Sequence, residues 1–172
     1  MSTLEMVSLV LPCRNQADHI GAILPRYVTA LESLRAPFEL VVVPNASTDS
    51  TQEVVEELAR AEPRIRVVCN PQGGWGLSVR TGLDAASGMV LAYTNTARTA
   101  PESVAHFVRV YCARGGQYLV KARRQARQAG SWKVHGPRKN TWPVLPAFTS
   151  ASEEIRCIGI IGNTTTRSIL TT

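Results

Sequence analysis

Polar side chains and a glycine turn follow the apolar runs of this chain, and their residue types suit a phosphorylated ligand. The positions concerned are Pro12, Arg14, Gln16, Asn45, Asp49, Gly76, Arg80, Asn95 and Arg98. Guanidinium groups hold phosphate oxygens with paired hydrogen bonds, and hydroxyl, carboxamide and carboxylate groups suit ribose and base edges. If these positions meet at one edge of a sheet, they predict a site for a nucleotide.

The glycine turn at residues 73–76 reads Gly-Gly-Trp-Gly. It is not a Gly-x-Gly-x-x-Gly dinucleotide motif, because Val79 stands where the third glycine would be. It is not a P-loop either, since no Gly-Lys-Ser/Thr follows it. Taken alone, such a run is more often a tight turn than a phosphate site.

Short apolar runs alternate with helical patterns through the first 121 residues. The expected strands cover residues 7–11, 38–43, 65–69, 89–93 and 117–121, and the expected helices cover 20–34, 50–62, 77–86 and 103–112. Ser50 and Glu53 have the spacing of a capping box, and Pro25 is expected to kink the first helix. Alternation with short connections predicts an α/β fold with three layers and a mostly parallel sheet. The carboxyl ends of parallel strands meet at one edge, where the polar positions then gather.

The 172 residues carry a net charge of +6 that is unevenly distributed. Residues 1–100 hold eight Lys/Arg and ten Asp/Glu, whereas residues 101–172 hold eleven and three. The run from Arg114 to Lys139 contains no acid, which suits an anionic membrane surface as partner or a solvated basic face. Nucleic acid is an unlikely partner, because only Tyr118 and Trp132 interrupt this run as aromatics.

The spacing of the cysteines and the N-terminal sequence indicate in which cellular compartment the chain is expected. The four cysteines lie more than forty residues apart, so neither a zinc ribbon nor a redox dithiol is expected. No secretion signal or membrane-spanning run is recognisable, which predicts a cytoplasmic chain, peripheral to the membrane if the basic run binds lipid.

Several motifs together resemble glycosyltransferase family 2, whose members have the GT-A fold. Residues 10–16 are similar to its opening Val-Ile-Pro-x-Tyr-Asn-Glu, and residues 39–51 to its Glu-Ile-Ile-Val-Val-Asp-Asp-Gly-Ser-Thr-Asp-Gly-Thr. Residues 70–88 resemble its Asn-x-Gly-x-Gly…Arg-x-Gly-Leu…Ala-x-Gly stretch. The resemblance covers residues 6–121 and is nearest to the branch similar to dolichyl-phosphate mannose synthase. It implies sugar transfer from a nucleotide-diphosphate donor to an acceptor. A lipid-linked or a phosphorylated acceptor fits this branch, and the sequence leaves its identity unknown.

The departures from this family lie where its chemistry is expected. Its Asp-Asp pair is Pro44-Asn45 here, and its metal-binding Asp-x-Asp is Asn95-Thr96-Ala97. With both carboxylates replaced, no cofactor is predicted and the family's divalent metal is not expected. Glu102 is the acid best placed in sequence to substitute for them. Arg98, with Arg14 or Arg80, is instead the candidate group to stabilise the leaving diphosphate, and no catalytic base is assigned.

The chain after Arg127 matches no family pattern. We therefore expect a nucleotide-sugar-binding domain over residues 1–127 and an irregular basic and polar tail over 128–172, in which residues 155–161 could form one strand. A genuine short tail, a truncation and a frame error in the gene all fit the sequence. A non-catalytic module that binds nucleotide sugars is the alternative to a transferase.

Overall fold

The computed structural model describes residues 5–97 and 99–114, together with the backbone of 120–124, 132–135 and 158–162. Its strands are β1 (Val7–Cys13), β2 (Phe38–Pro44), β3 (Ile65–Val67), β4 (Val90–Thr94), β5 (Val120–Arg124), β6 (Trp132–His135) and β7 (Ile158–Gly162). Its helices are α1 (Ala17–Glu32), α2 (Thr51–Ala61), α3 (Trp75–Ala85) and α4 (Pro101–Ala113). The strands form one sheet in the order β3-β2-β1-β4-β7-β5-β6.

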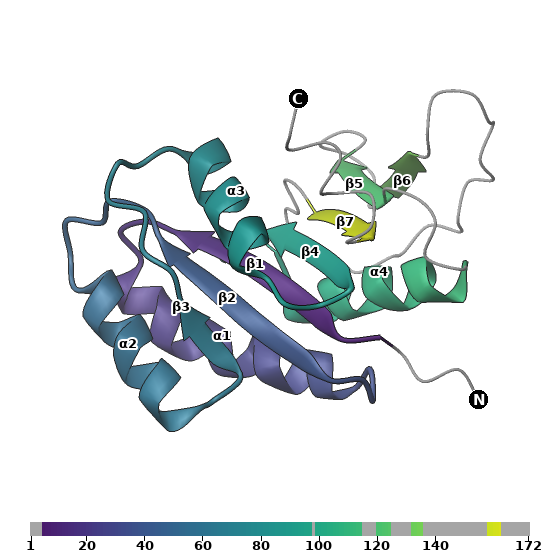
Figure 1. The fold of residues 1–172 in the computed structure, drawn as a ribbon, viewed down its shortest axis with the longest axis horizontal. Coiled ribbons are helices and arrows are strands. Elements are labelled where there is room, and N and C mark those ends of the chain that lie inside the picture. Colours follow the sequence, from purple (N-terminus) through teal and green to yellow (C-terminus); the bar gives the residue numbers. More distant parts are fainter. Residues whose placement is uncertain (1–4, 98, 115–119, 125–131, 136–157, 163–172) are drawn as a thin grey trace.

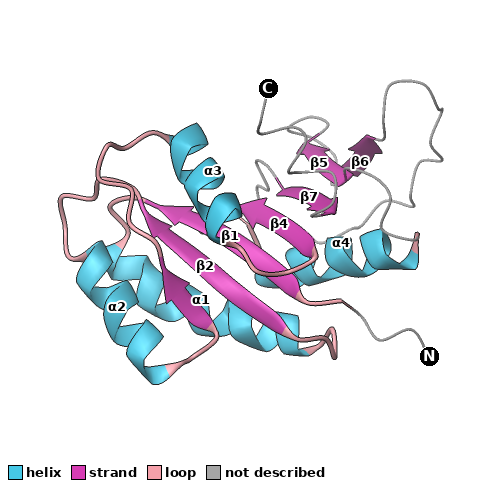
Figure 2. Cartoon of the chain, in the orientation of Figure 1, coloured by secondary structure: helices cyan, strands magenta, loops and turns pink. Residues whose placement is uncertain are grey.

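The helices cover the two faces of the sheet unequally (Figures 1 and 2). Helices α1, α2 and α4 lie on one face, and α3 lies across β1 and β2 on the other. Short connections between parallel strands require a helix as the crossover, which gives this alternation. The predicted three-layer α/β fold is confirmed.

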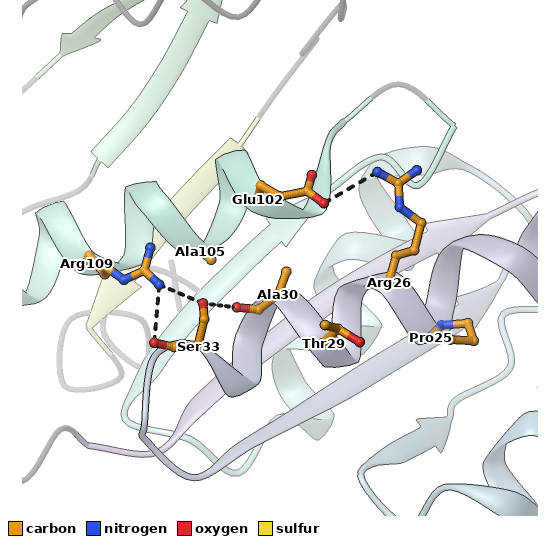
Figure 3. Close-up of a pocket in the computed structure, with 8 residues that line it drawn as sticks. All are labelled: Pro25, Arg26, Thr29, Ala30, Ser33, Glu102, Ala105 and Arg109. Atoms are coloured by element: carbon orange, nitrogen blue, oxygen red, sulfur yellow. Dashed lines mark hydrogen bonds and ion pairs between the residues drawn. The ribbon is translucent and has the colours of Figure 1, made fainter.

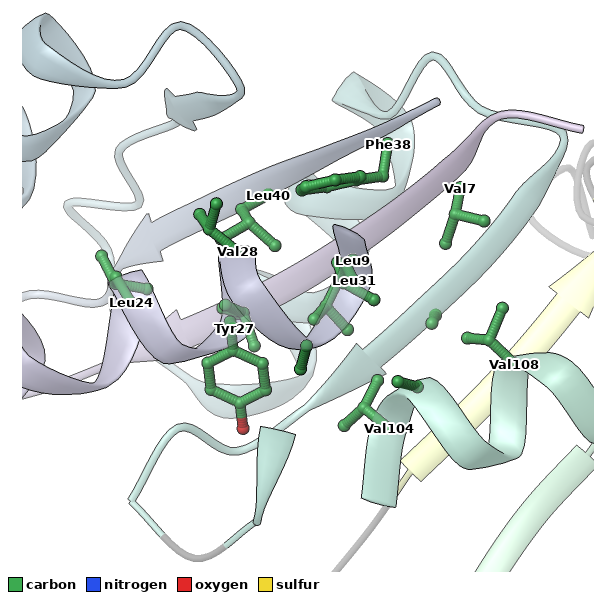
Figure 4. Packing of buried hydrophobic residues seen from close by; sticks show 14 of the residues in the cluster. Val7, Leu9, Leu24, Tyr27, Val28, Leu31, Phe38, Leu40, Val104 and Val108 are labelled. Atoms are coloured by element: carbon green, nitrogen blue, oxygen red, sulfur yellow. The ribbon is translucent and has the colours of Figure 1, made fainter. Parts of the chain in front are cut away.

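The parallel part of the sheet is buried on both faces. Every residue of β1 and β2 is buried, as near-continuous apolar runs in a covered parallel strand require. Side chains alternate between the faces, so that Leu9 and Leu40 pack with α1 and α4, and Val10 and Val41 lie in the smaller cluster on the α3 side. Figure 4 shows the larger cluster, with Tyr27 of α1 at its edge.

The second half of the sheet differs from the expected parallel order. Strand β7 pairs antiparallel with β4, and Ala92 faces Ile160 in the register. Strand β5, expected over residues 117–121, pairs antiparallel with both β7 and β6. The expectation of an irregular segment is wrong for β6, because backbone hydrogen bonds place it in the sheet, whereas β7 overlaps the strand that was expected over residues 155–161. The boundary at residue 127 stays a prediction.

Two local expectations about helices are also wrong. Helix α1 begins at Ala17, three residues earlier than predicted, and continues through Pro25 to Glu32. Ser50 makes no side-chain capping bond to α2. The amide of Thr51 donates instead to Asp49 Oδ1 at 3.1 Å, so the acid one residue earlier provides the cap.

Helix α3 lies unusually close to the sheet at Gly82. A Cβ atom at this position would lie 2.3 Å from Val10 Cγ1 and 3.0 Å from Val43 Cγ2. Only glycine permits this separation, which fixes the height of α3 above the ends of β1 and β2. The glycine turn that begins α3 is positioned by the same contact.

A buried carboxylate ties the start of β4 to β1 and β2. Glu39 is 4% exposed, and its Oε1 accepts hydrogen bonds from the Ser8 hydroxyl at 2.6 Å and the Ser87 amide at 2.7 Å. Its Oε2 accepts one from Arg66 at 2.7 Å, and the Gly88 amide donates to Ser8 Oγ at 2.8 Å. Burial would raise the pKa of Glu39, but these hydrogen bonds outweigh it and lower the pKa below its usual value.

Candidate functional site

The carboxyl ends of β1 and β2 lie side by side, as the sequence predicts. Pro12 is buried opposite Val43, and Cys13 is opposite Pro44 in the register. The pairing continues past the strand ends, since the Asn45 amide donates to the Cys13 carbonyl at 2.8 Å. These bonds set the backbone from which the polar side chains of this edge extend.

Asn45 is the most unusual polar residue of this edge. The residue is 7% exposed, and its Oδ1 is buried without a hydrogen-bond partner among the described residues. A Cβ atom at Gly73 would lie 3.8 Å from this oxygen, so the glycine turn lies directly against it. A buried acceptor without a donor costs free energy, and a functional role is one of the reasons for which a folded protein retains such a group.

The glycine turn is held in place by Asn70, which sequence reasoning did not select. The Asn70 backbone forms a bridge with Asn45, and its side-chain amide donates to Ser78 Oγ at 2.8 Å. The Ser78 hydroxyl in turn donates to the Gly74 carbonyl at 3.0 Å. Gly74 has a φ of 102°, which favours glycine. The signal available in the sequence was the asparagine that precedes the glycine pair.

Helix α3 carries four predicted or exposed residues near its N-terminus. Gly76 is exposed with open space around it, and Trp75 and Leu77 are 40% and 39% exposed. Arg80, one turn further, lies 3.8 Å from Asp84 in an exposed ion pair. Arg80 therefore already pairs with a carboxylate on its own helix, which makes it a weaker candidate for binding a phosphate.

Asp49 serves the helices of this edge, which sequence reasoning did not foresee. Its Oδ2 accepts a hydrogen bond from the Ala17 amide at 3.1 Å, and its Oδ1 accepts those of the Thr51 amide and hydroxyl. One carboxylate thus caps both α1 and α2. The hydrogen bond from the Thr51 hydroxyl is the main cause that lowers the pKa of Asp49, and backbone amides add to it. Both oxygens have protein partners, so its role in the structure is to hold α1 and α2.

The loops after β1 and β2 are joined by further side-chain bonds. Asn15, with a φ of 49°, accepts the Thr48 amide on its Oδ1 at 2.9 Å. The Gln16 amide donates to Thr51 Oγ1 at 2.8 Å, and Gln16 Oε1 accepts the hydroxyl of Thr96 at 2.6 Å. Gln16 therefore connects the ends of β1, β2 and β4, which brings this predicted residue to the centre of the edge.

Arg14 is exposed on the loop after β1 and has no hydrogen bond or ion pair with any residue that the structure describes. Arg98, the other predicted phosphate ligand, lies outside the described residues. Asn95 is half-buried, and its Oδ1 accepts the amide of Ala97 at 2.8 Å. Arg14 is thus the described arginine that is available to a ligand at this edge.

The acid expected to replace the missing carboxylates lies elsewhere. Glu102 pairs with Arg26 at 3.4 Å across a groove of about 500 Å³ between α1 and α4 (Figure 3). Arg109 closes the other end through a hydrogen bond to Ser33 Oγ at 2.6 Å. Glu102, the acid best placed in sequence to substitute for the aspartates, therefore pairs with Arg26 at the α1–α4 seam.

Metal-ligand and nucleophile chemistry have little support among the described residues. No group of three or more His, Cys, Asp or Glu side chains in that part of the chain is arranged to hold a metal ion. Burial raises the pKa of Cys13 to about 12, so its thiol stays protonated and is a poor nucleophile. No helix in the described segments is long and apolar enough to cross a membrane.

Comparisons with known proteins agree with this arrangement of strands and loops. The profile described as Glycosyl transferase family 2 matches residues 8–148. An undecaprenyl-phosphate 4-deoxy-4-formamido-L-arabinose transferase from Proteus mirabilis is 29% identical over 138 residues, which is 77% of this chain and 41% of that protein. The chain thus spans about two fifths of the length of this curated relative.

Solved structures show the same fold. A mannosyltransferase from Pyrobaculum calidifontis, in complex with GDP-Man and Mn²⁺, has a TM-score of 0.61 and 24% identity over 74% of this chain and 38% of its own. A mannosyl-3-phosphoglycerate synthase from Rubrobacter xylanophilus has a TM-score of 0.57 and 26% identity over 74% of this chain and 42% of its own. Both align with the four parallel strands and their helices at the level of fold.

Proposed function

The chain belongs to glycosyltransferase family 2, and on that premise we propose that it transfers a sugar from a nucleoside-diphosphate donor to an acceptor. Its four parallel strands and crossover helices form the GT-A fold of the solved neighbours. The carboxyl edge of these strands is where open α/β sheets bind ligands. The donor nucleotide is proposed to lie there, between the loop after β1 and the glycine turn.

The observation that carries this proposal is the buried, unpartnered Oδ1 of Asn45. A nucleobase or ribose offers N–H and O–H donors that would satisfy this oxygen, and a carboxamide can also donate one hydrogen bond in return. The glycine turn covers this oxygen at Gly73, whereas a Cβ atom at Gly76 would meet nothing within 4 Å, so the open space of the turn lies at Gly76. Exposed Trp75 begins α3 and offers an aromatic face beside it.

The acceptor is proposed from the relatives. The Proteus mirabilis relative is named for transfer to undecaprenyl phosphate, so a lipid phosphate is the acceptor class we propose here. Transfer leaves a nucleoside diphosphate with an added negative charge, and a positioned cation stabilises that charge. We assign this role to Arg14 and, from the sequence, to Arg98.

A nucleoside diphosphate is expected to raise the melting temperature of the chain, because any ligand that binds only the folded state stabilises it. The Asn45→Ala variant should bind about 1 kcal/mol more weakly, since it loses one useful hydrogen bond. Calorimetric titration with UDP, GDP, ADP and CDP measures both effects. Gln52→Ala, an exposed change on α2, is the control and should bind like the parent. A melting temperature that none of the four nucleotides raises would refute the proposed function.

A second expected result concerns the membrane. We propose that the basic run from Arg114 to Lys139 brings the chain to an anionic bilayer, where a lipid-phosphate acceptor is presented. Co-sedimentation with vesicles that contain phosphatidylglycerol should be strong at low salt and fall as salt is added, since exposed charges are screened. Vesicles of phosphatidylcholine alone are the control. Sedimentation that ignores salt and lipid charge would contradict an electrostatic contact.

A further inference from the structure

The loop between β4 and α4 is held by side chains of the chain itself. Its ends are joined by the hydroxyls of Thr94 and Thr99, which lie 2.8 Å apart. Thr94, Thr96 and Thr99 are all at most 4% exposed, so these hydroxyls are buried. Buried and satisfied polar groups of this kind fix a unique backbone path.

Helix α1 contributes three more contacts to the same loop. The Tyr27 hydroxyl donates to the Thr99 carbonyl at 2.9 Å, and His19 Nε2 lies 3.4 Å from the Thr96 carbonyl. Gln16, just before α1, accepts the Thr96 hydroxyl. The loop is therefore fastened to α1 and to the residue before it at two positions, Thr96 and Thr99.

The residues of this loop do not fit a divalent metal. Asn95 Oδ1 is turned toward the Ala97 amide, and Ala97 offers no side-chain oxygen. The Thr96 hydroxyl is used by Gln16. Mg²⁺ and Mn²⁺ prefer hard oxygen ligands that include carboxylates, and this loop presents none.

The acids that lie nearest in the described part of the chain are committed elsewhere. Asp49 caps α1 and α2 with both oxygens. Asp84 pairs with Arg80 on the surface of α3, and Glu102 pairs with Arg26 at the α1–α4 seam. Asp18 is exposed on the first turn of α1, and no group of three or more His, Cys, Asp or Glu side chains among the described residues could hold a metal ion. A metal would therefore lack the ligands it needs at this edge.

We propose that this chain binds its nucleoside diphosphate without a divalent cation, with the loop held by α1 and the phosphate charge met by Arg14. This inference rests on the proposed function and concerns how the negative charge of the bound diphosphate is neutralised. A metal ion that bridges a loop and a diphosphate has two effects. It fixes the conformation of the loop, and it neutralises the negative charge of the phosphates. Here the hydrogen bonds from Thr96 to Gln16 and from Tyr27 to the Thr99 carbonyl fix the loop, and the Arg14 guanidinium, which has no partner among the described residues, neutralises the charge.

The first test is calorimetric titration of UDP and GDP into the chain, once with EDTA and once with Mn²⁺. Affinities that agree within about twofold are expected, and an affinity that rises tenfold or more with Mn²⁺ would overturn the inference. Arg14→Ala should weaken binding roughly tenfold in EDTA, because it removes a charge-assisted contact. Arg60→Ala, an exposed arginine on α2, is the charge-matched control and should leave affinity unchanged. If the Arg14→Ala variant binds the nucleotide as tightly as the parent does, the proposed role of this arginine is refuted.

The second test restores carboxylates and reads the metal directly. In the double variant Asn95→Asp, Ala97→Asp, Mn²⁺ should bind, and its free electron-paramagnetic-resonance signal should fall below that of a protein-free sample with the same UDP concentration, whereas the signal with the parent should match the protein-free sample. The titration is run with and without UDP, so it decides the metal question even if no nucleotide binds. Absence of nucleotide binding would refute the proposed function, and a quenched Mn²⁺ signal in the parent would refute this inference.

Discussion

Gly82→Ala is expected to destabilise the chain by about 2 kcal/mol. The added methyl group would lie 2.3 Å from Val10 Cγ1, a distance that forces α3 away from the sheet. Overpacking of this kind costs about 1–3 kcal/mol, sometimes more, and the better helix propensity of alanine returns up to about 1 kcal/mol. Urea unfolding measures the difference in the free energy of unfolding.

Gly76→Ala in the same helix is the matched control. A Cβ atom at Gly76 meets nothing within 4 Å, so alanine there should stabilise the chain by about 0.5 kcal/mol through helix propensity. The two substitutions are chemically identical and should have effects of opposite sign. Similar effects of the two variants would mean that α3 does not pack on Val10 and Val43 as described.

Glu39→Ala is expected to destabilise the chain by about 3 kcal/mol. The change leaves the Ser8 hydroxyl and the Ser87 amide without their acceptor and removes the partner of Arg66. Loss of one member of a buried charged network costs about this much, because its partners stay desolvated. Glu53→Ala, exposed on α2, is the control and should change the free energy of unfolding by less than about 0.5 kcal/mol.

The same network predicts how stability depends on pH. Because hydrogen bonds lower the pKa of folded Glu39 below the usual value of 4.5, its contribution is complete above about pH 4.5 and is lost as pH falls through the folded pKa. The difference in the free energy of unfolding between the parent and the Glu39→Gln variant should therefore decrease as the pH is lowered. Urea unfolding of both proteins between pH 7 and pH 3 tests this expectation. A difference in the free energy of unfolding that stays constant with pH would contradict the lowered pKa of Glu39.

The parallel half of the fold could be predicted because its signals are local. Residues 38–43 are almost continuously apolar, and the structure buries all of β2 on both faces. The apolar spacing after Ile20 marks the buried side of α1, including Leu24 and Leu31. Helix α4 lies within three residues of its predicted bounds. In each case the hydrophobic period alone decides the structure.

The antiparallel half could not be predicted in the same way. Strand β7 follows β6 only after a long segment, and nothing in its own sequence says that it inserts beside β4. Strand order there depends on pairing between distant segments. The direction of β5 likewise follows from its pairing with β7.

At the candidate site, residue types were predicted more successfully than their partners. Gln16 and Asn45 were selected from the sequence, and both lie at the carboxyl edge of the sheet. Asp49 was assigned to the ligand because it follows the second strand at the predicted carboxyl edge of the sheet. Its capping of two helices depends on how the loop folds back onto Ala17 and Thr51, which no sequence spacing reveals.

The place of β1 in the sheet has a consequence for synthesis. Val7 pairs with Phe38 on one side, but its partner on the other side is Val90, about 80 residues later. Ribosomes add roughly 5–20 residues per second, so one edge of β1 waits on the order of 4–16 s for β4. During that time an apolar strand with an open edge can pair with a neighbouring nascent chain. The order of translation, rather than the stability of the finished sheet, sets when this chain is most prone to misassociate.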